Sequence, residues 1–184
     1  MAVGPAQQEA TVATKLDDQD EESDLGERPF FVDLFGGVNL PMSRALRRCG
    51  WNVTSYEQVH GQDIKDAQVK DAIIKDLWTA DAWWSAVPCE TTTRARDKPI
   101  SGDEHGPRPL RDEQHLWGLD GLKPWEQEQV NNSNECILLT TEAITISKHH
   151  KGEQAAGIEG PWNCLLWNFD VIAEKAQEAE QDGP

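Results

Sequence analysis

Short apolar runs alternate along the chain with segments in which apolar residues recur at helical spacing. Each short run is followed by a glycine, a proline or an acid, which is typical of a buried strand. The predicted strands cover residues 30–35, 51–56, 82–87 and 155–160. The predicted helices cover residues 41–50, 66–79 and 125–148. This alternation predicts an α/β fold, with a mainly parallel sheet flanked by helices.

Residues 91–122 interrupt the alternation, because they are rich in Gly, Pro and charge and show no period. A loop of that length inside a domain is usually functional or disordered. Three of the four cysteines, Cys49, Cys136 and Cys164, lie in apolar periodic segments and are expected to be buried. Cys89 differs, since it follows a proline at the end of a strand. The spacing of the cysteines and histidines indicates neither a metal site nor a disulfide framework.

Charge is distributed unevenly along the 184 residues, which hold 33 acids against 17 Lys and Arg for a net charge of -16. Residues 1–27 carry eight acids and one base (net -7), and residues 171–184 carry four acids and one base (net -3). We therefore expect acidic flexible tails at 1–28 and 170–184 around one domain at 29–169.

An acidic chain is a poor candidate for a nucleic-acid binder, because phosphate contacts need Lys and Arg. Residues 91–111 hold five bases against three acids, and we expect this to be the only segment suited to a phosphate backbone. No apolar run reaches 18 residues and no secretory signal is evident, so we expect no membrane partner and an intracellular location, in the nucleus or cytoplasm.

Candidate chemistry gathers where the predicted strands end, which is the edge where parallel α/β sheets bind ligands. Gly36 and Gly37 would let the backbone approach a nucleotide-type cofactor, and Glu57 could accept hydrogen bonds from ribose hydroxyls. Neither GxGxxG nor a phosphate loop is present, which disfavours dinucleotides and nucleoside triphosphates. Cys89 could attack an electrophilic carbon, and Glu159 could serve as an acid across the site. Each residue also has a structural alternative, as a strand-ending glycine, a solvent-facing acid or a buried cysteine.

Three of these segments resemble motifs of the cytosine-5 DNA methyltransferases. VDLFGGVNLPMSRALRRCG resembles the first motif, VPCETTTRAR the Pro-Cys nucleophile loop and GIEGP the Glu-Asn motif, in the same order over residues 30–168. The resemblance implies a Rossmann-like fold that depends on S-adenosylmethionine, here incomplete, and DNA as a partner. It also implies site roles. Cys89 would add to carbon 6 of cytosine, Glu159 would hydrogen-bond the ring, and Arg94 and Arg96 would contact the substrate. The implied cofactor-binding residues are Phe35, Gly36, Gly37, Glu57, Asp63, Ile64 and Pro88.

The chain departs from the family pattern at several places. Asn39 and Leu40 stand where the family has glycines, Gly160 replaces an Asn, and Thr91–Thr93 replace most of a Gln-x-Phe-Ser run. The interval between Glu57 and Asp63 is also short, and no target-recognition segment is evident. Three hypotheses therefore stay open: a methyltransferase that acts on cytosine in DNA, or on another substrate through the same fold; a catalytically inactive binding module or decayed fragment; and an unrelated α/β protein. A partner chain could supply the missing elements.

Overall fold

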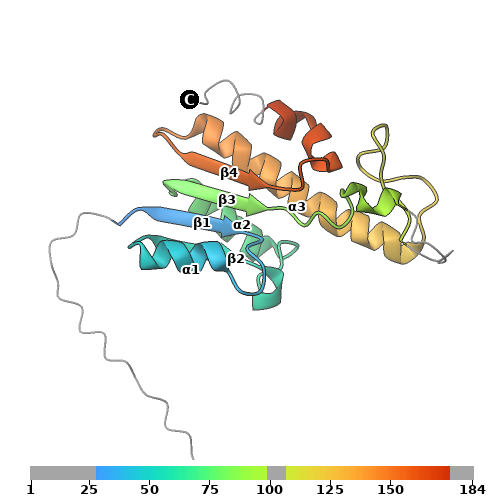
Figure 1. The fold of residues 1–184 in the computed structure, drawn as a ribbon. Helices are drawn as coiled ribbons and strands as arrows, with labels where there is room; N and C mark the ends of the chain where they lie inside the picture. Colours follow the sequence, from blue (N-terminus) through green and yellow to red (C-terminus); the bar gives the residue numbers. More distant parts are fainter. Residues whose placement is uncertain (1–27, 99–106, 175–184) are drawn as a thin grey trace, which may run out of the picture.

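The fold is a single parallel sheet with helices on both faces. A computed structural model describes residues 28–98 and 107–174. Its strands are β1 (Phe30–Leu34), β2 (Asn52–Tyr56), β3 (Ala82–Ala86) and β4 (Ala155–Glu159), ordered β2-β1-β3-β4 (Figure 1). All three strand pairings are parallel. The predicted α/β architecture is therefore confirmed, and it is compatible with a Rossmann-like fold.

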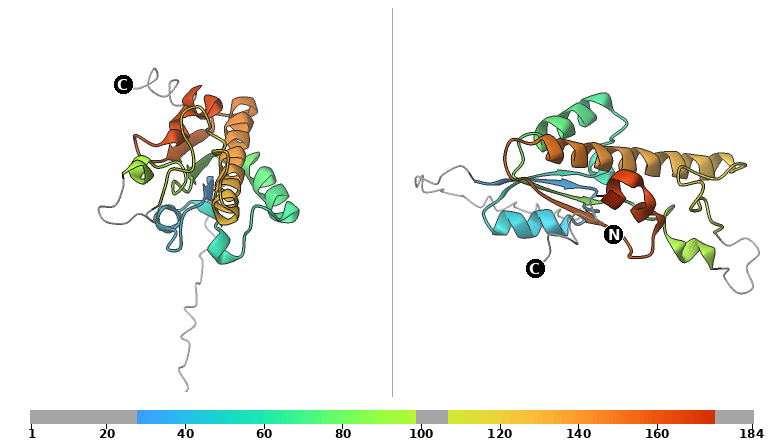
Figure 2. Two further views of the ribbon diagram at one scale, coloured as in Figure 1. Left: turned by 90° about the vertical axis from the view of Figure 1, so that its right-hand side faces the viewer. Right: turned by 90° about the horizontal axis from the view of Figure 1, so that it is seen from above.

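The helices divide between the two faces of the sheet. Helix α1 (Pro41–Arg48) lies on one face, whereas α2 (Ala67–Leu77) and the long α3 (Pro124–His149) lie on the other (Figure 2). Single 3-10 turns follow β2, β3 and β4, at η1 (Gln58–His60), η2 (Arg94–Asp97) and η3 (Leu165–Asn168). None of the described helices is both long and apolar enough to cross a bilayer.

The alternation of side chains along β1 builds two apolar cores. Val32 and Leu34 are fully buried in the larger core, together with residues of α2 and α3. Phe31 points to the other face and belongs to the smaller core, which α1 covers. Asp33 shares that second face, so a carboxyl group is buried beneath α1.

Two expectations about burial are wrong. Cys49 is exposed. Helix α1 turns Ser43 toward the sheet, and Cys49, which follows the last turn of the helix, therefore faces away from the sheet. Residues 170–174 are helical rather than part of a flexible tail, and Ile172 is fully buried in the larger core. The domain therefore extends beyond residue 169. The remaining tail predictions, at residues 1–27 and 175–184, lie outside the described residues.

Candidate functional site

The order β2-β1-β3-β4 places a topological switch point between β1 and β3, since the chain leaves β1 for one neighbour and later returns to its other side. Ligands of open parallel sheets bind in the crevice beyond the strand ends at this point. A cavity of about 290 Å³ lies there. Six of the seven predicted cofactor-binding residues line it: Phe35, Gly37, Glu57, Asp63, Ile64 and Pro88. The strand ends thus bring together residues that are up to 53 positions apart in sequence.

The loop between β1 and α1 forms one wall of this cofactor cavity. Gly37 has a φ of 73° and donates its N–H to Oε2 of Glu57 at 2.9 Å. Phe35 and Leu40 also have positive φ values, of 61° and 45°. Positive φ values cost free energy for residues other than glycine, and such residues tend to occur at functional sites. Neither Asn39 nor Leu40 lines the cavity, so these departures from the family pattern do not obstruct it.

Gly36 is the one predicted cofactor residue that does not line the cavity. A Cβ atom at Gly36 would lie 2.6 Å from Oδ2 of Asp33, so the glycine is needed for the turn to close over this carboxyl group. Ser43 donates a short hydrogen bond to Asp33 and lies 2.5 Å from the hydroxyl of Ser55. The second oxygen of Asp33 is buried and has no hydrogen-bond partner among the described residues. Burial raises the pKa of Asp33, and the Ser43 hydrogen bond offsets part of the rise.

We expect Asp33→Asn to make the fold more stable at neutral pH. The raised pKa means that folded protein holds this proton more tightly than unfolded protein, so wild-type stability falls as pH rises above 3.8 and through the folded pKa. Asn removes this loss and still accepts from Ser43. Thermal unfolding between about pH 4 and pH 7 should show a gap that widens with pH. The exposed Asp71→Asn is the matched control, and parallel profiles for wild type and Asp33→Asn would contradict the assignment.

A second cavity, of about 490 Å³, holds the predicted catalytic pair. Cys89 follows β3 and Glu159 ends β4, and both side chains line this catalytic cavity. Ala86 and Pro88 line both cavities. A group bound in the cofactor cavity would therefore lie next to a group held between Cys89 and Glu159.

The three threonines after Cys89 hold its loop in place. The Cys89 carbonyl accepts the N–H groups of Thr92 and Thr93 at 3.1 and 2.8 Å. The Thr92 carbonyl in turn accepts from Leu165 N–H at 2.8 Å, which ties the loop to the segment after β4. Thr91 and Thr92 are buried. The departure from the family's Gln-x-Phe-Ser run is thus a packing feature of this chain.

Gly160, another departure, is also explained by packing. A Cβ atom at this position would lie 3.0 Å from the Leu166 side chain and 3.4 Å from the sulfur of Cys164. Cys164 is buried, and burial raises the pKa of its thiol. An Asn at position 160 would require this neighbourhood to shift, so the glycine fits the tight turn that follows Glu159.

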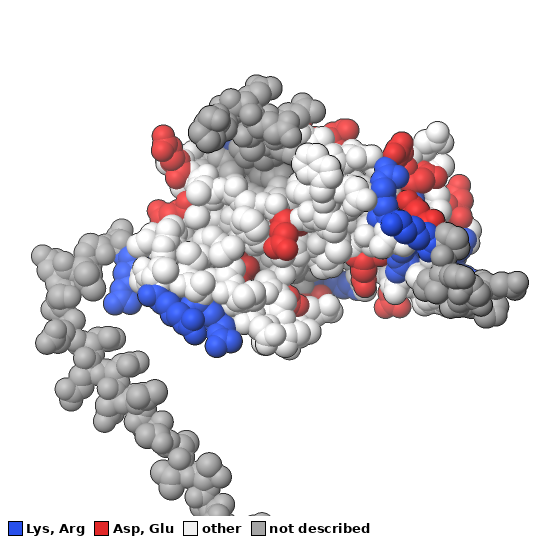
Figure 3. Space-filling model, in the orientation of Figure 1, with Lys and Arg blue, Asp and Glu red and all other residues white. Residues whose placement is uncertain are grey.

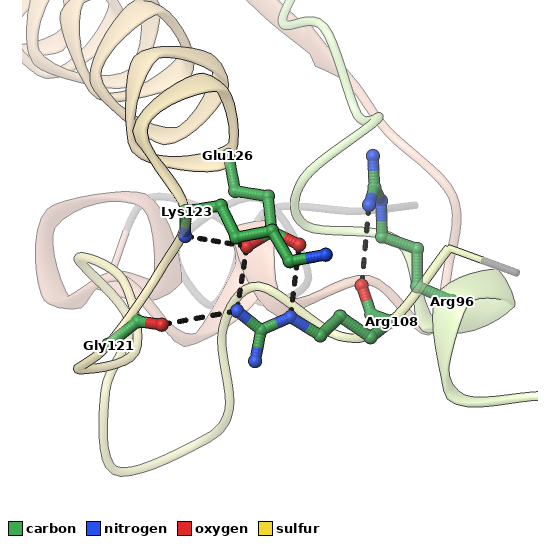
Figure 4. A network of polar contacts seen from close by, with 5 residues as sticks. All are labelled: Arg96, Arg108, Gly121, Lys123 and Glu126. Atoms are coloured by element: carbon green, nitrogen blue, oxygen red, sulfur yellow. Dashed lines mark hydrogen bonds and ion pairs between the residues drawn. The ribbon is translucent and has the colours of Figure 1, made fainter. Parts of the chain in front are cut away.

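The predicted substrate contacts of Arg94 and Arg96 are not favoured by the geometry, because both side chains are bound elsewhere. Arg94 pairs with Glu113 at 2.6 Å, and Arg96 donates to the carbonyls of Glu90 and Arg108. Arg108 forms a two-pronged contact with Glu126 and lowers the pKa of that carboxyl to about 2 (Figure 4). Neither Arg94 nor Arg96 lines the catalytic cavity. Apart from Lys98, the described bases at 91–111 therefore make contacts within the domain and hold the loop in place.

Arg111 is a residue whose role the sequence reasoning missed. It is 2% exposed and donates to uncharged acceptors only: Thr91, the carbonyls of Leu116 and Val130, and Asn134. Burial lowers its pKa to about 10, so the guanidinium stays charged at neutral pH. Through Thr91 this single side chain ties the Cys89 loop to α3. In the sequence, Arg111 is one of five bases in a segment without helical or strand pattern, and nothing distinguishes it from the other four.

Helix α3 supplies a cavity wall that the motifs did not reveal. Asn132, Glu135 and Cys136 line the cofactor cavity. The Oδ1 atom of Asn132 is buried without a hydrogen-bond partner in the described part of the chain. Burial raises the pKa of Cys136 to about 12, and nearby carboxylates add to the rise. The half-buried Cys136 thus stays a neutral thiol on an acidic wall.

The charge of the cofactor cavity limits what it can hold. Glu57, Asp63 and Glu135 line it against the single cation Lys65. Phosphate groups are disfavoured beside three carboxylates, whereas a cationic or neutral ligand with hydroxyl and amino donors is favoured. The described residues contain no cluster of three or more His, Cys, Asp or Glu that could hold a metal ion. No protein-family model, curated protein or solved structure matches this chain.

Proposed function

We propose that this chain binds S-adenosylmethionine in the cofactor cavity and transfers its methyl group to carbon 5 of a cytosine held between Cys89 and Glu159. One observation carries the proposal. Residues chosen from three separate motifs line two cavities that adjoin at Ala86 and Pro88. A methyl donor and a methyl acceptor must meet in this way, because transfer needs the reacting atoms within van der Waals contact.

The chemistry of the cofactor cavity supports this choice of cofactor. S-adenosylmethionine carries a sulfonium, an ammonium, one carboxylate and no phosphate; its net positive charge suits a wall of three carboxylates, and its carboxylate suits the one lysine. Glu57 already accepts one backbone N–H through Oε2, and its other oxygen is available for a ribose hydroxyl. The unpartnered Oδ1 of Asn132 could accept a hydrogen bond from an amino group of the ligand.

Two side chains of the catalytic cavity would act on the base. The Cys89 sulfur forms a bond to carbon 6, which makes carbon 5 electron-rich, and it leaves again when the carbon 5 proton is lost. Glu159 hydrogen-bonds the ring nitrogen and the amino group and so stabilises the charge that develops on the ring. The bound cofactor supplies the methyl group. A cytosine inside a duplex would first have to be flipped out of the stack.

A second candidate, a binding module without catalysis, is favoured by a different observation. Arg94 and Arg96 are engaged within the loop, so the described surface beside the catalytic cavity offers few cations for a phosphate backbone. In this case the cofactor cavity would be used and the catalytic cavity would not.

Cofactor binding tests the proposal first. We expect calorimetry to detect binding of S-adenosylmethionine, and Glu57→Gln to weaken it about tenfold, because a hydrogen bond to a charged group contributes about 1.5–3 kcal/mol. Gln can still accept the Gly37 N–H, so the loop should keep its shape. Glu128→Gln, on the exposed surface of α3, is the matched control. No heat with folded wild-type protein at high micromolar ligand would overturn the proposal, whereas unchanged binding by Glu57→Gln would overturn the role of Glu57.

A further inference from the structure

A strongly basic surface lies where the sequence analysis did not expect one. Residues 28–56 contain four arginines and one acid, and that acid, Asp33, is fully buried. The four residues Arg28, Arg44, Arg47 and Arg48, here called the α1 arginine face, are exposed. Figure 3 shows basic side chains as a band at the lower left, along α1, with no acidic side chain drawn within the band; the basic side chains at the right of the view lie among acidic ones. The expectation that residues 91–111 form the only basic segment is therefore wrong.

The α1 arginine face has few carboxylate neighbours within the described structure: Arg47 acts on the buried Asp33, where it offsets part of the rise in the pKa of that carboxyl. None of its four residues forms an ion pair there, whereas Arg94 and Arg108 are both paired. Arg47 uses part of its guanidinium to donate to the Val53 carbonyl at 2.9 Å. In a chain with almost twice as many acids as bases, four neighbouring arginines that form no ion pair in the described structure are a surface of excess positive potential.

A groove joins the two ends of this face. It has a volume of about 870 Å³ and lies at the amino ends of the strands, away from the two cavities described above. Arg28 and Arg47 line it, together with the half-buried Trp51. Asp81 also lines it, but this carboxylate already accepts the Phe30 N–H at 2.7 Å. The groove therefore offers two guanidinium groups and an aromatic wall.

The chain itself carries a segment of matching charge. Residues 17–27 contain seven acids and no base, and they immediately precede Arg28. We propose that this acidic run is the occupant of the α1 arginine face, which it matches in charge.

Length and tethering favour this occupant over an external one. Eleven residues can span up to about 36 Å when extended, whereas the eight residues of α1 rise only about 12 Å. The run is joined to the face without a linker, so its effective concentration there is in the millimolar range or above. An external nucleic acid would have to compete with this run while being repelled by a chain of net charge -16.

A peptide competition experiment on the full chain tests the proposal. The probe is a fluorescein-labelled peptide of residues 15–27, added in trans at low ionic strength and followed by anisotropy. The test variant neutralises the seven acids of the run, Asp17, Asp18, Asp20, Glu21, Glu22, Asp24 and Glu27, to Asn or Gln. We expect this variant to bind the probe about tenfold more tightly than wild type, because its face is vacant. Arg44→Gln with Arg48→Gln in the same background should abolish the gain, and both side chains are exposed, so we expect the fold to tolerate the change.

Two controls make the outcome decisive. The first neutralises seven acids elsewhere, Asp71, Asp120, Glu128, Glu153, Asp170, Glu178 and Glu180, and should leave probe binding within about twofold of wild type, which separates occupancy from net charge. The second replaces the peptide with a duplex DNA probe. Equal peptide binding by wild type and test variant, a gain that the first control reproduces, or a gain that survives loss of both arginines overturns the proposal. Arginine-dependent DNA binding that is as tight in wild type as in the test variant assigns the face to nucleic acid instead.

Discussion

On the proposed function, we expect the wild-type chain to form a covalent complex with DNA containing 5-fluorocytosine in the presence of S-adenosylmethionine, and Cys89→Ala to abolish it. Cys89 lines the catalytic cavity together with Glu159, and its sulfur is the atom that would bond to carbon 6. With fluorine at carbon 5, no proton can be lost from that carbon after methyl transfer, so the sulfur cannot leave and the complex persists. A denaturing gel or mass spectrometry of the intact protein would show the adduct.

A matched cysteine keeps this test specific. Cys49 is exposed at the end of α1 and does not line the catalytic cavity, so Cys49→Ala should leave adduct formation unchanged. Glu159→Gln should slow it about 100-fold or more, because it weakens a proton-linked contact to the ring. If wild-type protein binds S-adenosylmethionine but never forms the adduct, DNA methylation is excluded and the binding module becomes the better description.

Arg111→Met should lower the free energy of unfolding by about 3–5 kcal/mol, since it leaves several buried acceptors on three segments without a donor. The side chain is 2% exposed, and its contacts join Thr91, the Leu116 carbonyl and α3. Chemical denaturation measures the loss. Arg94→Met removes an exposed pair with Glu113 and should cost at most about 1 kcal/mol. Similar values for the two variants would show that Arg111 does not hold this region together.

A second readout separates the role of Arg111 in the Cys89 loop from its role in stability. Thr91 lies two residues from Cys89 and accepts from the Arg111 Nε at 3.1 Å. Under conditions where the variant is still folded, we expect the Cys89 thiol of Arg111→Met to react with iodoacetamide several-fold faster than in wild type, because its loop opens more often. An unchanged rate would mean that the carbonyl contacts around Cys89 hold the loop without Arg111.

The local sequence pattern was enough to predict the sheet, because each strand is a short apolar run followed by a glycine, a proline or an acid, which disfavour continuation of a strand. The parallel order then fixed which strand ends meet, and so Glu57, Pro88, Cys89 and Glu159 were correctly expected at one edge. The roles of these residues stay predictions.

The sequence did not allow the side-chain partners to be predicted, because these partners lie in segments that are far apart in the chain. Arg94 pairs with Glu113 and Arg111 donates to the Val130 carbonyl of α3, so two bases of a loop that appeared open to a partner are engaged within the fold. The prediction of which face of α1 is buried was wrong for a similar reason. Ser43 takes the buried position because it hydrogen-bonds Asp33 of β1, and Cys49 is turned outward as a result. A polar residue in an apolar stripe gives no sign of such a partner.

The two cavities differ in how much of the chain must be assembled before they exist. The cofactor cavity is lined by the loops after β1, β2 and β3, by the last residues of β2 and β3 and by α3, and it needs nothing from β4. The catalytic cavity needs β4, which pairs with β3 across 73 residues, Ala82 beside Ala155, the longest-range pairing in the described sheet. Closing such a long loop carries the largest entropic cost. Local detachment of β4 would thus carry Glu159 away from Cys89 and leave the cofactor cavity whole, so we expect ligand binding in the cofactor cavity to be less sensitive to opening of this sheet edge than any reaction in the catalytic cavity.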